Sequence, residues 1–89
     1  MPFVLICRDR PGALQTRLDT RAAHLAYVEE TGAVQIGGPL IRDGQMAGSL
    51  VILGVETREE AETWAAGDPY AQAGLFESVE IEEWKRVIG

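Results

Sequence analysis

The order of hydrophobic and polar positions at the start of the chain predicts a strand followed by a helix. Residues Phe3–Cys7 form a short apolar run that contains β-branched side chains, which is typical of a strand buried on both faces. After a polar turn at residues 8–12, apolar residues recur at helical spacing from Leu14 to about Glu30. These residues are Leu14, Leu18, Leu25 and Val28. Gly32 lies just beyond them, where glycine commonly ends a helix.

The middle of the chain predicts two strands joined by a tight turn. Residues 33–41 have strand character, and the Gly-Gly-Pro sequence at 37–39 predicts a bulge or a close approach of another backbone segment. The Asp-Gly pair at 43–44 is typical of a hairpin turn. The next run, residues 46–55, is apolar at both alternating sets of positions, which favours a strand covered on both faces.

Helix signals follow in the second half of the chain. Thr57 and Glu60 have the spacing of a capping box and predict a helix that ends near Gly67. Asp68 and Pro69 then predict one further helical turn, with Asp68 at the N-cap and Pro69 at the first helical position. A last strand is predicted from residue 76 onward, and a slip in its alternation before residue 84 predicts a bulge near residues 82 and 83.

The resulting element order is β-α-β-β-α-β with a short extra helix before the last strand. This order matches the ferredoxin-like α+β fold, in which two helices lie on one face of a four-stranded antiparallel sheet. We find no linker, repeat or low-complexity tract, so the sequence predicts a single domain over residues 1–89.

A fold of this kind leaves one face of the sheet without a cover. The first and third strands are nevertheless apolar on both faces, and a chain of 89 residues has a small core to which burial against a partner adds substantially. The simplest cover is the sheet of an identical chain, packed face to face across a two-fold axis. The sequence therefore predicts a homodimer formed through this face, and leaves a higher oligomer open.

Composition excludes several classes of function. With 8 basic against 14 acidic residues the net charge is −6, which disfavours nucleic acid as a partner. No apolar run approaches the ~18 to 20 residues of a membrane span and no signal peptide is recognisable, so we expect a cytoplasmic protein without membrane contact. The single Cys7 forms no internal disulfide, and the single His24 disfavours a zinc site. No phosphate loop or nucleophile motif is present, and we expect neither metal nor cofactor.

Three basic side chains of the first helix are candidates for chemistry. On a helical wheel Arg21 falls near the centre of the apolar stripe, while Arg17 and His24 lie together at its edge. An arginine on a buried face needs an anionic partner or a solvated cleft, so this helix either borders a pocket or pairs internally with a carboxylate. The structural alternative is that Arg21 extends its head group to water and His24 is an ordinary, partly exposed residue.

Asp68 and Ser49 are further candidates with simple structural alternatives. Asp68 is explained by its N-cap position alone, although one carboxylate oxygen could cap while the other faces a cleft. Ser49 follows Gly48 in a strand and could direct its hydroxyl into a pocket beside Gly37 and Gly38. Cys7 ends the first strand, where a buried thiol usually behaves as a small hydrophobic residue.

Taken together, several short motifs resemble the YciI-like (YCII) family over essentially the whole chain. They are Arg21-Ala-Ala-His24-Leu25, Gly37-Gly38-Pro39, Gly48-Ser49, Asp68-Pro69-Tyr70 and Ala73-Gly74. The resemblance implies a ferredoxin-like fold of the dimeric α/β-barrel group and an active site centred on His24 and Asp68. Relatives include enzymes that dehalogenate chlorinated muconolactones. Ala22 stands at the position after the arginine that is usually alanine or proline in the family, whereas Glu83 replaces a proline often seen before the tryptophan. Neither residue belongs to the implied pair.

This pair can transfer protons at neutral pH. A carboxylate on one ring nitrogen of a histidine fixes its tautomer and stabilises the imidazolium, which is the role implied for Asp68 beside His24. Arg21, assisted by Arg17, would hold a carboxylate of the substrate, and Ser49 and Tyr70 complete the expected substrate site.

Two classes of function stay open from the sequence. The first is a small enzyme that moves a proton on an organic acid or lactone, leading to isomerisation or to elimination such as the loss of HCl. The second is a dimeric module that binds a small metabolite without converting it. Haem binding through His24 is a third alternative, because other dimeric ferredoxin-like folds bind haem.

Overall fold

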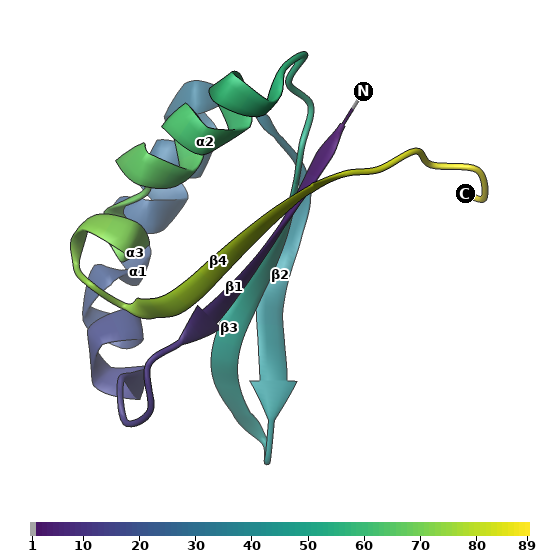
Figure 1. Cartoon of the computed structure of the whole chain (residues 1–89). Helices are drawn as coiled ribbons and strands as arrows, with labels where there is room; N and C mark the ends of the chain where they lie inside the picture. The colour runs from purple at the N-terminus through teal and green to yellow at the C-terminus, as the bar shows by residue number, and fades with distance from the viewer. Residues whose placement is uncertain (1) are drawn as a thin grey trace.

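The computed structural model, which describes residues 2–89, has the predicted element order (Figure 1). Its elements are β1 (Phe3–Asp9), α1 (Leu14–Thr31), β2 (Val34–Arg42), β3 (Gln45–Leu53), α2 (Arg58–Gly67), α3 (Pro69–Gln72) and β4 (Phe76–Glu83). The four strands form one antiparallel sheet in the order β2-β3-β1-β4. Figure 1 shows all three helices on one face of this sheet. The ferredoxin-like α+β prediction is therefore confirmed.

The core lies between the sheet and the helices. It is built by alternate residues of the two central strands together with two residues of α2, as expected for side chains that point to one face of a sheet. The members are Phe3, Leu5, Cys7, Val51, Leu53, Ala61 and Trp64. The α2 helix begins at the predicted N-cap, where the Thr57 hydroxyl accepts from the Glu60 N–H at 3.1 Å.

No helix of residues 2–89 covers the other face of the sheet, where Ile52 is buried and Val4, Ile6 and Leu50 are partly exposed (Figure 1). Val4 pairs with Ile52, and Ile6 pairs with Leu50, so these four alternate with the core residues and point away from the helices. The prediction that the first and third strands are apolar on both faces is confirmed. On the neighbouring β4 the same face carries Glu80 and Glu82.

The predicted bulge near Glu82 and Glu83 is wrong. Both residues pair regularly with β1, and the register shift lies at the other end of that pairing, between Arg8 and Asp9. The alternation of apolar and polar residues is lost before Trp84 because β4 ends at Glu83, so that Trp84 lies outside the strand.

Residues 37–39 do not form the predicted bulge either. They pair in regular register with β3, and the irregularities of β2 flank them, between Val34 and Ile36 and between Leu40 and Ile41. The close backbone approach lies instead on the neighbouring strand, since a Cβ on Gly48 would collide with the carbonyl oxygen of Cys7. Gly37 pairs with Val51 and leaves space on the helix face of the sheet, whereas Gly38 pairs with Leu50 and faces the other side.

None of the helices formed by residues 2–89 combines the length and the apolar character that crossing a membrane requires.

The buried Cys7 gives a test of this packing. Burial raises the pKa of the Cys7 thiol to about 12, and the negative charge of Asp68 adds to the increase. At about pH 8 an exposed cysteine is partly ionised and reactive, but Cys7 is almost entirely in its unreactive thiol form. We expect a disulfide reagent to modify native Cys7 very slowly and the denatured chain at once, as followed by thiol titration. Rapid reaction of the native protein would contradict the packing of β1 against the helices.

Candidate active site

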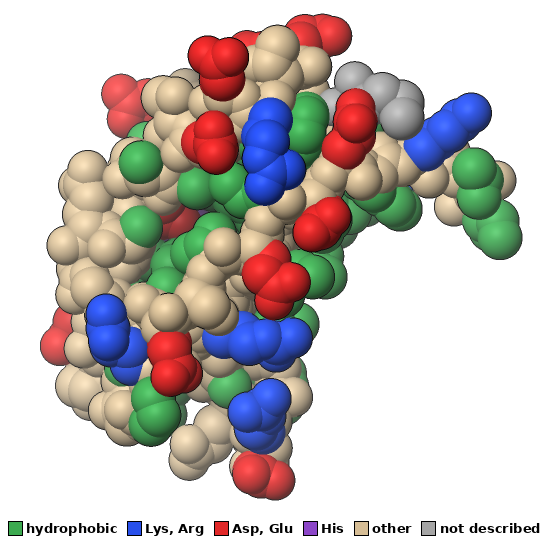
Figure 2. All heavy atoms as spheres, viewed as in Figure 1, with side chains coloured by type: hydrophobic (Ala, Val, Ile, Leu, Met, Phe, Trp, Pro, Cys, Tyr) green, Lys and Arg blue, Asp and Glu red, His purple; other side chains and the backbone are tan. Residues whose placement is uncertain are grey.

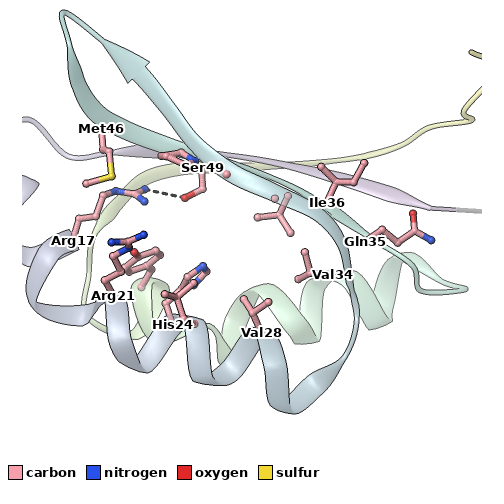
Figure 3. A pocket seen from close by; sticks show the side chains of 15 residues that line it. Arg17, Arg21, His24, Val28, Val34, Gln35, Ile36, Met46 and Ser49 are labelled. Carbon is pink, nitrogen blue, oxygen red and sulfur yellow. Dashed lines mark hydrogen bonds between the residues drawn. The ribbon is translucent and has the colours of Figure 1, made fainter. Parts of the chain in front are cut away.

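A cavity of about 310 Å³ lies between α1 and the part of the sheet formed by β2 and β3 (Figure 3). Its helix wall carries Arg17, Arg21 and His24, and its sheet wall carries Ser49 (Figure 3). The remaining wall is mainly apolar and includes Leu25, Val28, Val34, Met46 and Val51. Gly37 pairs with Val51 and so faces α1, where its missing side chain leaves space for the cavity. A few polar groups on a mostly apolar wall are typical of small-molecule sites.

His24 and Asp68 form a hydrogen-bonded pair. The distance between His24 Nδ1 and Asp68 Oδ1 is 2.8 Å. An ionised carboxylate can only accept, so Nδ1 carries the proton and the lone pair of the neutral ring lies on Nε2. His24 lines the cavity, whereas Asp68 is 3% exposed and lies behind it. This arrangement gives the cavity a nitrogen that can accept a proton.

Asp68 is also the N-cap of α3. The Tyr70 N–H donates to Asp68 Oδ1 at 3.0 Å. The sequence left open that one oxygen caps the helix while the other serves the cleft, but the structure uses the same oxygen for both contacts. Asp68 Oδ1 therefore both caps α3 and binds His24.

Tyr70 holds the histidine ring on a second side. The rings of Tyr70 and His24 are stacked, with centroids 4.0 Å apart and an interplanar angle of 14°. The Arg17 guanidinium carbon lies 4.7 Å from the centre of the Tyr70 ring, within the range of a cation–π contact. Burial raises the pKa of Tyr70 against the lowering effect of Arg17 and Arg21, so its hydroxyl stays neutral.

Arg17 is fixed by a carboxylate that the sequence analysis missed. Arg17 Nε and Nη2 donate to the two carboxylate oxygens of Asp9 at 2.7 and 2.8 Å, and Nη2 also donates to Ser49 Oγ at 2.9 Å. Burial lowers the pKa of Arg17, but the hydrogen bond and the charge of Asp9 outweigh it and the net pKa is raised. The alternation along β1 could have indicated this partner, because Asp9 is the next odd-numbered residue after Phe3, Leu5 and Cys7, which face the helices.

The helical wheel placed Arg21 nearer the centre of the buried stripe than Arg17, but the structure shows the opposite. Arg17, at 3% exposure, is the buried one, whereas Arg21 is exposed. The reason is that the cavity occupies the space over Arg21, so no side chain of the sheet covers it. No salt bridge joins Arg21 to any of residues 2–89, which leaves its charge available at the cavity.

The six residues singled out from the sequence therefore come together. Five of them line the cavity, and Asp68 supports His24 from behind. They are Arg17, Arg21, His24, Ser49, Asp68 and Tyr70.

A model of the YCII-related domain family matches residues 1–85. The chain belongs to the YCII family. Protein YciI of Escherichia coli O6:H1 (strain CFT073) is 35% identical over 97 aligned residues, which cover 98% of this chain and 99% of that protein.

A solved structure supports the same family relationship. It is the 5-chloro-2-hydroxyhydroquinone dehydrochlorinase TftG of Burkholderia phenoliruptrix AC1100 in complex with 2,5-dihydroxybenzoquinone. It is 40% identical, covers 96% of this chain and 94% of its own, and superposes with a TM-score of 0.87. An antibiotic biosynthesis monooxygenase, 8% identical, matches with a TM-score of 0.56 over 96% of this chain and 98% of its own, which shows a common fold only.

The hydrogen bond between His24 and Asp68 makes a specific prediction about the imidazole tautomer. In alkaline solution, where the ring is neutral, we expect the form protonated at Nδ1 to dominate, and the Asp68→Asn variant to populate it less because the carboxylate charge is lost. Nitrogen-15 chemical shifts of the single histidine measure this ratio without resonance assignment. The exposed Asp19→Asn is the matched control on α1. Equal tautomer ratios in wild type and Asp68→Asn would contradict the pairing.

Proposed function

We propose that this YCII protein is an acid–base enzyme that eliminates HCl from a small chlorinated, hydroxylated ring. The observation that carries the proposal is the contact of His24 Nδ1 with the buried Asp68 at the cavity wall. A histidine oriented in this way accepts a proton at Nε2 and its carboxylate partner stabilises the resulting imidazolium. The relationship to TftG, named a dehydrochlorinase, supports elimination in preference to isomerisation of a lactone.

The reaction balances without an added oxidant or reductant. A proton of one ring hydroxyl first moves through water to the chlorine-bearing carbon, which gives the keto tautomer in which that carbon carries both hydrogen and chlorine. His24 Nε2 then takes the proton of a second hydroxyl. The electron pair of that O–H bond forms a carbon–oxygen double bond, and a ring double bond shifts to the chlorine-bearing carbon. Chloride leaves with the electron pair of the carbon–chlorine bond. The protonated His24 then releases its proton to water, so the sum of the steps is the loss of HCl. Asp68 stays ionised throughout and holds the imidazole in place.

The rest of the cavity suits a flat, anionic ring. Its volume of about 310 Å³ is near the lower end of the range for ligand pockets. Apolar side chains such as Val28 and Val34 contact the ring faces and exclude water, which strengthens electrostatic contacts inside the cavity. The unpaired Arg21 attracts the negative charge of the substrate, and in a chain of net charge −6 such a local cation also guides anions to this opening.

The proposal predicts a large loss of activity in His24→Gln. Glutamine retains hydrogen bonding but cannot accept the proton, so chloride release from 5-chloro-2-hydroxyhydroquinone should fall roughly 100- to 10,000-fold, the usual contribution of general acid–base catalysis. Initial rates above the spontaneous reaction are measured with a chloride electrode. Ala23→Gln places the same side chain at the exposed neighbouring position and should retain activity. A wild-type protein that binds the compound without releasing chloride would instead support the metabolite-binding module.

The open face of the sheet is the proposed interface of a homodimer. Val4, Ile6, Leu50 and Ile52 form its apolar centre, and Ile36 of β2 extends it at 51% exposure. Residues 84–89, which we call the C-terminal arm, project from the sheet on the side away from the helices (Figure 1). Hydrophobic side chains cover the end of this arm, and acidic side chains follow β4 (Figure 2).

The arm has the properties of a segment that docks on a second copy. Val87 and Ile88 are 79% and 90% exposed, and the arm begins with the basic pair Lys85 and Arg86. In a two-fold dimer the basic residues of one arm can face the acidic row of β4 on the partner, which is complementary in charge. The Trp84 indole N–H is buried without an acceptor among residues 2–89, and a second chain can supply one.

This dimer predicts a clear response to charge in the arm. The double variant Val87→Asp/Ile88→Asp should shift the protein from dimer to monomer, because it places two carboxylates where apolar contact is expected. Sedimentation equilibrium measures the mass in solution. Leu18→Asp introduces one such carboxylate at a half-exposed position of α1, on the helix layer, and should leave the dimer intact. A monomeric wild type, or dissociation by Leu18→Asp alone, would rule out this interface.

A further inference from the structure

Gly37 is a glycine that the backbone of β2 does not require. Its φ lies outside the left-handed region, and it pairs in regular register with Val51. A Cβ added there would lie 3.4 Å from Val34 Cγ1 and 3.8 Å from Val51 Cγ2, which is ordinary van der Waals contact. Glycine inside a strand weakens the sheet, because it has no side chain to pack. Gly37→Ala is therefore compatible with the fold, and what the glycine provides is space in the cavity.

The space at Gly37 has an apolar character. The three atoms nearest to the absent Cβ are methyl carbons of Val34 and Val51 and the main-chain carbonyl oxygen of Leu50, which is 3.7 Å away. An ordered water molecule usually needs about three polar partners, and only one of these three atoms is polar. The space is better suited to an apolar group of a ligand than to water.

This space belongs to the apolar end of the cavity. Figure 3 shows Arg17 on one side of His24, and Val28 and Val34 on the other side. Gly37 adjoins Val34 and therefore lies at the same end as the two valines. A ring bound beside His24 presents its polar groups to the arginine end, and the opposite edge of the ring faces the valines.

We propose that the substrate ring carries an apolar substituent that the reaction does not remove, such as a methyl group or a second halogen, and that this substituent lies on Gly37 between Val34 and Val51. Gly37 is then a specificity-determining residue, because it sets the size of group that fits. The proposal rests on the proposed function and specifies its substrate class. The departing chloride needs a different place, since an anion is poorly accommodated among valine methyls.

A methyl group on the ligand tests this space. The probes are 2,5-dihydroxybenzoquinone, the compound bound to TftG, and its 3-methyl derivative. The two ring C–H positions of the parent compound are equivalent, so one derivative tests both. In calorimetric titration, wild type should bind the methyl compound about fourfold more tightly, the effect of burying one such group. Equal or weaker binding of the methyl compound, or no binding of either compound, would overturn the proposal.

Gly37→Ala places a methyl group of the protein in the same space. We expect the preference for the methyl compound to disappear, while the dissociation constant of the parent compound changes little. Gly38→Ala is the matched control, because its Cβ points to the opposite face of the sheet and meets no atom within 4 Å. It should keep the preference. Retention of the preference in Gly37→Ala, or its loss in Gly38→Ala as well, would contradict the assignment of Gly37.

A double variant separates the loss of space from a general disturbance of the strand. Gly37→Ala/Val34→Ala removes the methyl carbon nearest to the new Cβ and should restore the preference, whereas failure to restore it would place the substituent elsewhere. Thermal unfolding gives an independent readout, because Gly37→Ala should unfold at no lower temperature than wild type. Earlier unfolding together with equal weakening of both compounds would make Gly37 a structural residue and overturn the proposal.

Chloride release decides the proposed elimination separately. If the preference for the methyl compound fails while His24→Gln still abolishes chloride release, the elimination stands and the apolar subsite falls. If wild type shows the preference and Gly37→Ala loses it, but wild type releases no chloride, the subsite stands and the elimination falls.

Discussion

A buried carboxylate must be given hydrogen bonds, and the way in which Asp68 meets this requirement determines the rest of the site. The residue is 3% exposed, and its Oδ1 accepts both from the backbone N–H of Tyr70 and from His24 Nδ1. The first contact starts α3, and the second joins α3 to α1, which lies more than forty residues earlier in the chain. Without such partners the burial of a charged group would be strongly unfavourable. The same oxygen thus connects the fold to the chemistry.

The same requirement acts a second time at the neighbouring Arg17. Here the buried charge belongs to α1 and the partner, Asp9, comes from the end of β1. Removing one member of a buried ion pair commonly costs about 3 to 5 kcal/mol, because the other charge is left uncompensated. Tyr70 lies in contact with both groups, stacked on His24 and 4.7 Å from the Arg17 guanidinium. One buried ion pair, one hydrogen bond to a buried carboxylate and one aromatic ring therefore hold the polar wall of the cavity before any ligand arrives.

Much of the fold was accessible from the sequence because it depends on local patterns. Hydrophobic periodicity and capping residues such as Thr57 and Asp68 predicted the order and approximate bounds of the elements, and these are confirmed. The bulge placed near Glu82 was wrong because a strand end and a bulge give the same slip in alternation. The bulge predicted at residues 37–39 was also wrong, since these residues keep regular register with β3 and Gly37 leaves room for the cavity.

By itself the sequence determined which residues are chemically suited to a site, because residue type and helical or strand phase are local properties. It singled out His24 and Asp68, and it showed that β1 and β3 have two apolar faces. Only the tertiary structure decided which partners these residues have. The position of α1 over the sheet decides that Arg17 is buried and Arg21 is exposed. It also decides that Arg17 pairs with Asp9. That placement follows from packing between segments distant in the sequence, which no local pattern specifies.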